Sequence, residues 1–160
     1  MLIKRLDPQT LQLKGKSVTI ELGQTVTIAG HQIESPGEYE LSGVSLEWPT
    51  ADVRLVRFED CYILQLYNLN RLLTDEELEQ VGIATILILP VGGTEAKGLE
   101  PKMAVEVMNQ IDPSLVILNQ YESVEPFRTA YPKGLEVAPE LKITNTTLPE
   151  ERQVYVIDNV

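Results

Sequence analysis

Two runs of almost uninterrupted apolar residues lie in the second half of the chain, at 85–89 and 115–118. Such runs are typical of strands that are covered on both faces of a sheet. Between them, Pro101 opens a segment in which apolar residues recur every three or four positions up to Ile111, which predicts a helix. A strand, a helix and a further strand of this kind form a right-handed unit with parallel strands. We therefore expect a central βαβ unit, with any ligand beyond the carboxyl ends of its strands.

The residues at these two strand ends are the first candidates for a functional site. Gly92 and Gly93 follow the first strand, and Asn119, Gln120 and Tyr121 end and follow the second. Two adjacent glycines can bind an anion through their N–H groups, but they are also common in a simple turn after a buried strand. The site would then be built from backbone, amides and a phenol.

In the segments before this unit, apolar and polar residues alternate, as is typical of short strands. Residues 2–46 contain turn signals at Gly15, at 23–24 and at 35–37, and they predict a meander of strands. Residues 53–58 and 61–67 predict a hairpin that turns at 59–60 and extends the central sheet. Trp48 and Pro49 are expected to end the strand series before it.

Three helices and two late strands complete the prediction. Thr74 and Glu77 have the spacing of a capping box, Leu73 and Leu78 that of a hydrophobic staple, and Gly82 is a stop signal, which together predict a helix over 75–81. The remaining segments are expected as follows: the helix of the βαβ unit over 101–111, a short helix over 124–130, and strands at 141–144 and 154–157.

Composition narrows the class of protein. A chain of 160 residues suits one domain spanning 1–160. The 13 Lys and Arg against 24 Asp and Glu give a net charge of −11, so neither nucleic acid nor an anionic membrane is an expected partner. No apolar run has the length of a signal peptide core or a membrane span, so we expect a cytoplasmic protein.

The single cysteine and the single histidine offer little chemistry. Cys61 lies within an apolar strand pattern next to acidic residues, which favours a buried structural thiol over an activated one. His31 follows Gly30 in a predicted turn, and a lone imidazole there is more often a surface residue than a metal ligand or a base. Nucleophilic catalysis would need a nucleophile and a base that the sequence does not bring together.

Several segments, taken in order, resemble the metallo-β-lactamase-fold hydrolases, in particular the bacterial branch that includes lactonase-like proteins. The similar segments are 35–44, 73–78, 86–93, 101–104 and 109–111, and the resemblance extends from about residue 18 to residue 156. It implies an α+β fold in which two β-sheets form a sandwich flanked by helices. It also implies metals held at the edge of the sheets.

The metal ligands of that family have no counterpart here. The family's His-x-His-x-Asp-His motif is replaced by a tight turn between Leu22 and Val26, so the N-terminal part is expected to be shortened. Asn68 stands in the position that resembles the family's bridging Asp, and the segment 119–121 stands where the last His is expected. Amides are weak ligands for zinc. The resemblance therefore predicts the fold without a metal or any other cofactor.

Three functional hypotheses follow from the sequence. The first is a catalytically inactive, metal-free relative that acts by protein–protein contact or self-association. The second is a metal-independent binder of a small ligand in the relic pocket, which we define as Asn68, Gly92, Gly93, Gln120 and Tyr121. The third is a metal-dependent hydrolase, for which the ligands are missing.

Self-association would need an exposed anchor, and Trp48 with Leu46 on the same strand face is the candidate. Tryptophan is over-represented at interface hot spots, and a shortened meander would leave strand edges open. The alternative is that Trp48 folds into the core.

Overall fold

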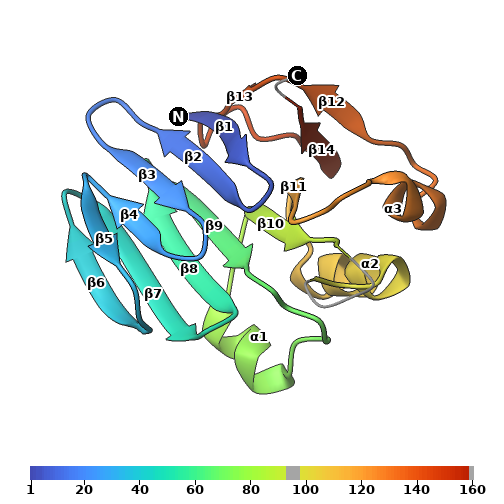
Figure 1. Ribbon diagram of the computed structural model, residues 1–160, viewed down its shortest axis with the longest axis horizontal. Coiled ribbons are helices and arrows are strands. Elements are labelled where there is room, and N and C mark those ends of the chain that lie inside the picture. The colour runs from blue at the N-terminus through green and yellow to red at the C-terminus, as the bar shows by residue number, and fades with distance from the viewer. Residues whose placement is uncertain (93–97, 159–160) are drawn as a thin grey trace.

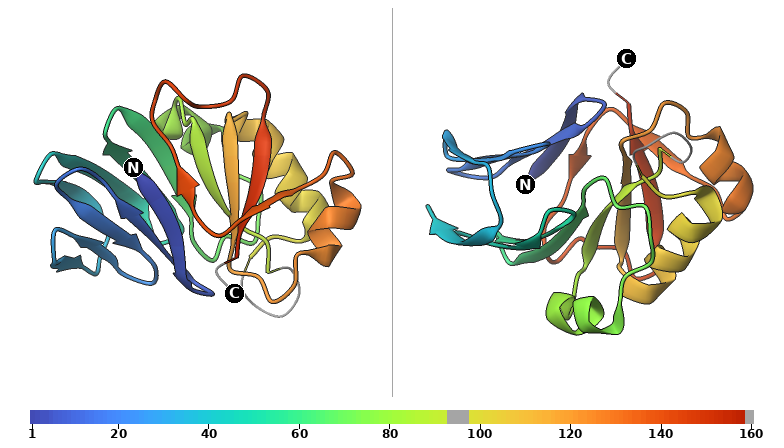
Figure 2. Two further views of the ribbon diagram at one scale, coloured as in Figure 1. Left: turned by 90° about the horizontal axis from the view of Figure 1, so that it is seen from above. Right: turned by 60° about the horizontal axis from the view of Figure 1, so that its bottom comes forward.

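The computed structural model describes residues 1–92 and 98–158, and its strands form two sheets that pack face to face (Figures 1 and 2). Sheet A contains, in spatial order, β13 (Leu141–Lys142), β1 (Leu2–Asp7), β2 (Thr10–Lys14), β3 (Thr19–Leu22), β4 (Val26–Ile28) and β5 (His31–Ile33). Sheet B contains β12 (Glu136–Ala138), β14 (Gln153–Ile157), β11 (Leu115–Asn119), β10 (Ile86–Pro90), β9 (Cys61–Leu66), β8 (Val53–Phe58), β7 (Val44–Thr50) and β6 (Gly37–Leu41).

The predicted βαβ unit forms the centre of sheet B. β10 and β11 are parallel, with Ile86 opposite Leu115, and β9 and β14 run parallel to them on either side. The connecting helix α2 (Pro101–Ile111) begins at the expected proline. It ends where Asp112 adopts a left-handed conformation with φ 54°. The carboxyl ends of three parallel strands, β9, β10 and β11, therefore meet at one edge of the sandwich.

The helices α1 (Asp75–Val81), α2 and α3 (Glu125–Ala130) all pack on the outer face of sheet B (Figure 2). One apolar cluster fills the space between the two sheets, and a second fills the space between sheet B and the helices. Along the strands of sheet A, buried and outward-facing residues alternate. Leu11, Leu13 and Ile20 are buried, and Gln12 and Glu21 face outward. This alternation is typical of a sheet with one solvated face.

The start of α1 confirms the predicted capping box. The Thr74 hydroxyl accepts a hydrogen bond from the Glu77 N–H at 3.1 Å, and the Glu77 carboxylate accepts one from the Thr74 N–H at 2.9 Å. Gly82, at φ 62°, follows the last turn and donates its N–H to the Leu78 carbonyl. The helix spans the predicted residues because both of its end signals are local.

β7 continues through Trp48, Pro49 and Thr50, where the sequence predicted the end of the strand series. Its pairing with β8 shifts register between Glu47 and Thr50, and such a bulge accommodates a proline that has no N–H to donate. The predicted meander is also divided, because β6 and β7 belong to sheet B while β1 to β5 belong to sheet A.

The structure contradicts the hypothesis that Trp48 is an exposed interface anchor and agrees with the alternative, that Trp48 folds into the core. Trp48 is only 4% exposed and lies with Leu46 in the cluster between the sheets, because inward-facing positions of β7 run through both residues. Cys61 is buried in the same cluster, and its burial raises the pKa of the thiol, as expected for a structural cysteine. His31 is exposed at the start of β5.

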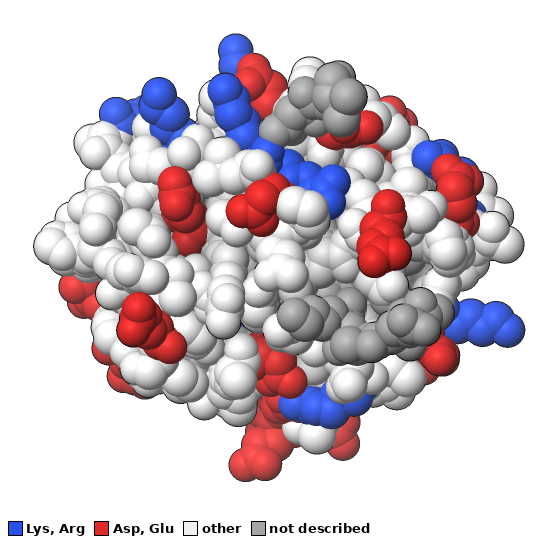
Figure 3. Space-filling model, in the orientation of Figure 1, with Lys and Arg blue, Asp and Glu red and all other residues white. Residues whose placement is uncertain are grey.

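The surface charges are mixed on the face seen in Figure 3, where acidic and basic side chains are interspersed. Among the described residues, none of the helices has the length and apolarity needed to cross a membrane.

Candidate functional site

Two amide side chains meet where β9 and β11 end. Gln120 donates from Nε2 to Asn68 Oδ1 at 2.6 Å, and its own Oε1 accepts the Asn68 N–H at 2.9 Å. Both residues have left-handed backbones, with φ 57° at Asn68 and φ 53° at Gln120. The positions that resemble the family's bridging Asp and its last His are therefore neighbours in space, and their side chains bind each other.

The turn between β1 and β2 closes over this pair from sheet A. The Gln120 N–H donates to the Pro8 carbonyl at 3.2 Å, and the Asn119 side-chain amide donates to the Gln9 carbonyl at 3.3 Å. The Tyr67 hydroxyl donates to Gln9 Oε1 at 2.9 Å. These hydrogen bonds from Gln120, Asn119 and Tyr67 to the β1–β2 turn tie the two sheets together at this edge.

Two tyrosines at this edge pair with arginines. Arg5 donates to the Tyr121 hydroxyl at 2.8 Å and lies 4.2 Å from the centre of its ring. Burial raises the pKa of Tyr121 and of Tyr67, and this effect outweighs the opposing influence of Arg5 and Arg54 respectively. Both phenols therefore stay neutral at neutral pH, where they act as hydrogen-bond donors and acceptors rather than as bases.

Arg54 is a further residue at this edge and, like Arg5, Tyr67 and Gln9, was not among the candidates predicted from the sequence. It is 1% exposed, and its guanidinium lies between two aromatic rings, 4.3 Å from the ring centre of Trp48 and 4.6 Å from that of Tyr67. It donates to the carbonyl of Gly23, to that of Gln24 at 2.7 Å and to Gln65 Oε1 at 2.9 Å. Burial lowers its pKa to about 10, so the side chain remains a cation at neutral pH.

The contacts of Arg54 explain the tight turn between β3 and β4. That turn stands where the resemblance places the family's metal-binding motif, and here its carbonyls bind a side-chain cation of the protein itself. One sequence signal indicates this role: Arg54 lies on the same strand face as Val56 and Phe58, which both point into the space between the sheets. An arginine at such a position needs buried acceptors.

Gly92, the first of the two glycines, is half-buried after β10. Val91 donates to the Asn119 carbonyl at 3.0 Å, which keeps this end of β10 beside β11. Gly98 packs against Gly92 so closely that a Cβ added to Gly98 would lie 2.6 Å from the Gly92 nitrogen. Gly93 lies outside the described residues.

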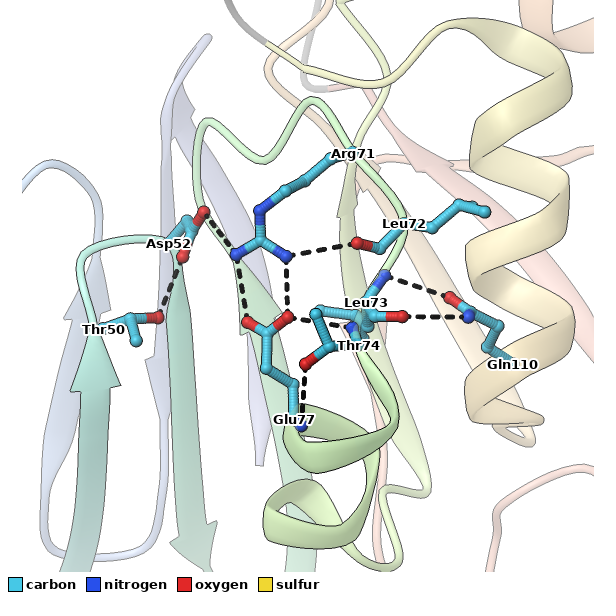
Figure 4. Close-up of polar contacts among 8 residues, drawn as sticks. All are labelled: Thr50, Asp52, Arg71, Leu72, Leu73, Thr74, Glu77 and Gln110. Atoms are coloured by element: carbon cyan, nitrogen blue, oxygen red, sulfur yellow. Dashed lines mark hydrogen bonds and ion pairs between the residues drawn. The ribbon is translucent and has the colours of Figure 1, made fainter.

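The segment that carries Asn68 is held in place by a polar network (Figure 4). Gln110 of α2 binds both the N–H and the carbonyl of Leu73, each at 3.2 Å. Arg71 donates to both carboxylate oxygens of Glu77, at 2.6 and 3.0 Å, and forms a 3.4 Å ion pair with Asp52 at the β7–β8 turn. The loop after β9 is therefore fixed to two helices and to a neighbouring turn.

The residues at this edge do not fit a metal ion. Within the described part of the chain, no group of three or more His, Cys, Asp or Glu residues could hold one. The oxygens of Asn68 and Gln120 already accept hydrogen bonds, and neutral amides are weak ligands for zinc. The guanidinium of Arg54 adds positive charge at the same edge, which disfavours a second cation.

Comparison with solved structures identifies the fold. A predicted Zn-dependent hydrolase of the metallo-β-lactamase superfamily from Thermotoga maritima aligns with a TM-score of 0.77 and 23% identity, covering 98% of both chains. The metallo-β-lactamase fold protein YhfI from Bacillus subtilis aligns with a TM-score of 0.49 and 9% identity over 77% of this chain and 49% of its own. No protein-family model matches the sequence, and no curated protein matches it.

The chain therefore has a metallo-β-lactamase-like fold, as the sequence resemblance implied. The lactonase-like branch and the shortening of the N-terminal part remain predictions. The Thermotoga protein is matched over nearly its whole length, so the two chains have about the same extent.

Proposed function

We propose that this protein is a catalytically inactive, metal-free relative of the metallo-β-lactamase-fold hydrolases and that it acts by association with another protein. One observation carries the inactive, metal-free part of the proposal: the side chains at the edge where the resemblance places the metal bind one another and the β1–β2 turn. Asn68, Gln120 and Tyr67 all use their polar atoms in these contacts. A site built in this way stabilises the fold instead of presenting ligands.

The chemistry of hydrolysis gives a second line of support. In metal-dependent hydrolases the ion lowers the pKa of a bound water from 15.7 to about 7 and so supplies the nucleophile. The groups here are neutral amides, protonated phenols and guanidinium cations, none of which can deprotonate water at neutral pH. The Thermotoga protein is described as a predicted Zn-dependent hydrolase, but that description applies to that protein, because 23% sequence identity supports only a shared fold.

Activity assays with added metal test the proposal. The purified protein is incubated with Zn²⁺ or Mn²⁺ and with a panel of lactone, phosphodiester, thioester and β-lactam substrates, and an active metallo-β-lactamase serves as the positive control. We expect no turnover above the rate of metal and buffer alone. Metal-dependent turnover of any substrate that is abolished by a chelator and restored by metal would refute the inactive assignment.

A second candidate function is binding of a small ligand at the same edge. It is favoured by Asn119 Oδ1, which is buried without a hydrogen-bond partner among the described residues, while Nδ2 of the same side chain is bound to Gln9. Asn119 is 1% exposed, so a ligand would have to open this edge to donate to the oxygen, and its binding would then raise the melting temperature with the logarithm of its concentration over its Kd. A thermal-shift screen of small polar metabolites tests this candidate, with Asn119→Leu as the variant that lacks the acceptor.

A further inference from the structure

The outer face of sheet B is covered only in part. The cluster between this sheet and the helices draws residues from β8, β9, β10, β11 and β14 but, within the described chain, none from β6 or β7. Figures 1 and 2 show these two strands extending beyond the helices. The outer face of β6 and β7 is therefore open to a partner.

Three carboxylates gather on this open face. Glu38 and Glu47 are directly opposite each other in the β6–β7 pair, and Glu40 is the next outward-facing residue of β6. Like charges directly opposite on paired strands destabilise a sheet. None of the three forms an ion pair with a described residue. The fold thus retains an unfavourable cluster of negative charge that a positively charged partner would relieve.

A groove lined by both polar and apolar side chains continues from these carboxylates. A cavity of about 360 Å³ extends from Ser45 and Glu47 across β8 and β9 to the end of α1. Tyr62 and Ile83 line it and are 42% and 77% exposed, which places two of the exposed large apolar residues on one surface. Arg57 also lines this groove, with its guanidinium 5.1 Å from the centre of the Tyr62 ring, so one positive charge stands beside the three carboxylates and leaves the surface net negative.

We propose that this surface, formed by Glu38, Glu40, Glu47, Tyr62 and Ile83, is the docking site for a basic segment of another protein that carries an apolar anchor residue. The lysines or arginines of the segment would pair with the three carboxylates, and its apolar residue would enter the groove between Tyr62 and Ile83. The inference rests on the proposed function, because it specifies the partner of a protein that acts by association.

A second copy of the chain is a poor occupant of the same surface. A symmetric dimer brings the same patch of both copies together, so the carboxylates of one copy would face those of the other. Such like-charge contacts suppress wrong partners. The net charge of −11 on each copy adds to the repulsion. Charge complementarity therefore selects a basic partner.

Binding of a defined peptide tests this inference. The probe is a synthetic peptide of about 12 residues in which lysine and leucine alternate, and a glutamate and leucine peptide of the same length is its control. At about 0.15 M salt, where distant charges are screened, we expect the amide NMR signals of Glu47, Tyr62 and Ile83 to shift with the basic peptide. The acidic peptide should leave these signals in place.

Matched charge reversals separate this surface from the general acidity of the protein. The double variant Glu38→Lys/Glu40→Lys should raise the Kd at least about tenfold, which corresponds to roughly 1.4 kcal/mol. The control variant Glu106→Lys/Glu136→Lys changes the net charge equally, at exposed acids of α2 and β12, and should change the Kd less than about twofold. Ile83→Ser, at an exposed site that leaves the fold intact, should also weaken binding.

Two results would overturn the inference: signals that shift elsewhere on the molecule, or an equal loss of affinity in the control double variant. Either result leaves the inactive assignment untouched, because that assignment depends on the metal and substrate assays. Metal-dependent turnover, in contrast, would refute the inactive assignment without altering the peptide map.

Discussion

Asn68 and Gln120 hold each other through two hydrogen bonds, 2.6 and 2.9 Å long, that join the ends of β9 and β11. Each residue has a left-handed backbone, a conformation that is uncommon for side chains other than glycine and asparagine. The pair is therefore a specific structural contact at the edge where related folds are expected to hold metal.

The coupling between these two residues is the first prediction. Gln120→Ala removes both hydrogen bonds and should lower the free energy of unfolding by about 2 kcal/mol, whereas Asn68→Ala removes only the bond to its Oδ1 and should cost about 1 kcal/mol. The double variant should cost less than the sum of the two, with a coupling of about 1 kcal/mol or more. Urea unfolding of the four proteins measures this cycle. Strict additivity would show that the contact contributes nothing.

Arg54 is predicted to be essential for stability. Arg54→Met leaves two backbone carbonyls and Gln65 without their donor between the sheets, and we expect a loss of about 3 kcal/mol or more. Arg54→Lys should also destabilise the protein, because a single ammonium group cannot reproduce a planar, stacked guanidinium. Arg57→Met, on the exposed side of the same strand, is the control and should change stability by less than about 0.5 kcal/mol. Equal effects at both positions would contradict this role.

Much of the fold was predictable because its signals are local. The apolar runs that form β10 and β11, the periodicity of α2 and the capping box at Thr74 depend on residues close together in sequence. The family resemblance, not a local pattern, grouped Asn68 and Gln120 in one relic pocket. In the structure these two residues are in direct contact.

The remaining features depend on contacts between distant segments. Arg54 binds the β3–β4 turn, and Gln9 binds Tyr67 and Asn119, only because the two sheets pack face to face. No local pattern specifies which turn lies over which strand end. The end of β7 was mispredicted: Pro49 reads as a strand end, but the bulge with β8 lets the strand continue to Thr50.

Because Trp48 is buried between the two sheets, we predict that it contributes to stability rather than to association. Trp48→Ala should lower the free energy of unfolding by about 3–5 kcal/mol, because a large buried ring is removed from the space between the sheets. Trp48→Phe keeps an aromatic face for Arg54 and should cost less. Unfolding curves and sedimentation of both variants check this. A Trp48→Ala protein of unchanged stability and altered association would contradict the core assignment.

The ion pair at the start of α1 predicts a pH dependence. The hydrogen bond from Arg71, aided by the N–H of Thr74, lowers the pKa of Glu77 from 4.5 to about 2. A depressed carboxyl pKa stabilises the folded state above the unfolded value, so this contribution is complete above about pH 4.5 and is lost as the pH falls toward 2. Because Arg71 is 44% exposed, solvent screening reduces the effect.

Comparison of the parent protein with Glu77→Gln measures this contribution. The difference in unfolding free energy at pH 7 should shrink progressively between pH 4.5 and pH 2. Glu76→Gln, at an exposed position of the same turn, is the control and should show no such trend. A difference that is constant with pH would mean that Arg71 and Glu77 do not interact in solution.

The metal content of the purified protein shows whether this edge of the sandwich binds a metal ion. Protein expressed in medium supplemented with zinc, iron and manganese and purified without chelator is analysed by inductively coupled plasma mass spectrometry, with an active metallo-β-lactamase prepared in parallel. We predict far less than one metal ion per chain, because amides, phenols and guanidinium groups occupy the edge where ligands would stand. One or two tightly held ions per chain would contradict the account.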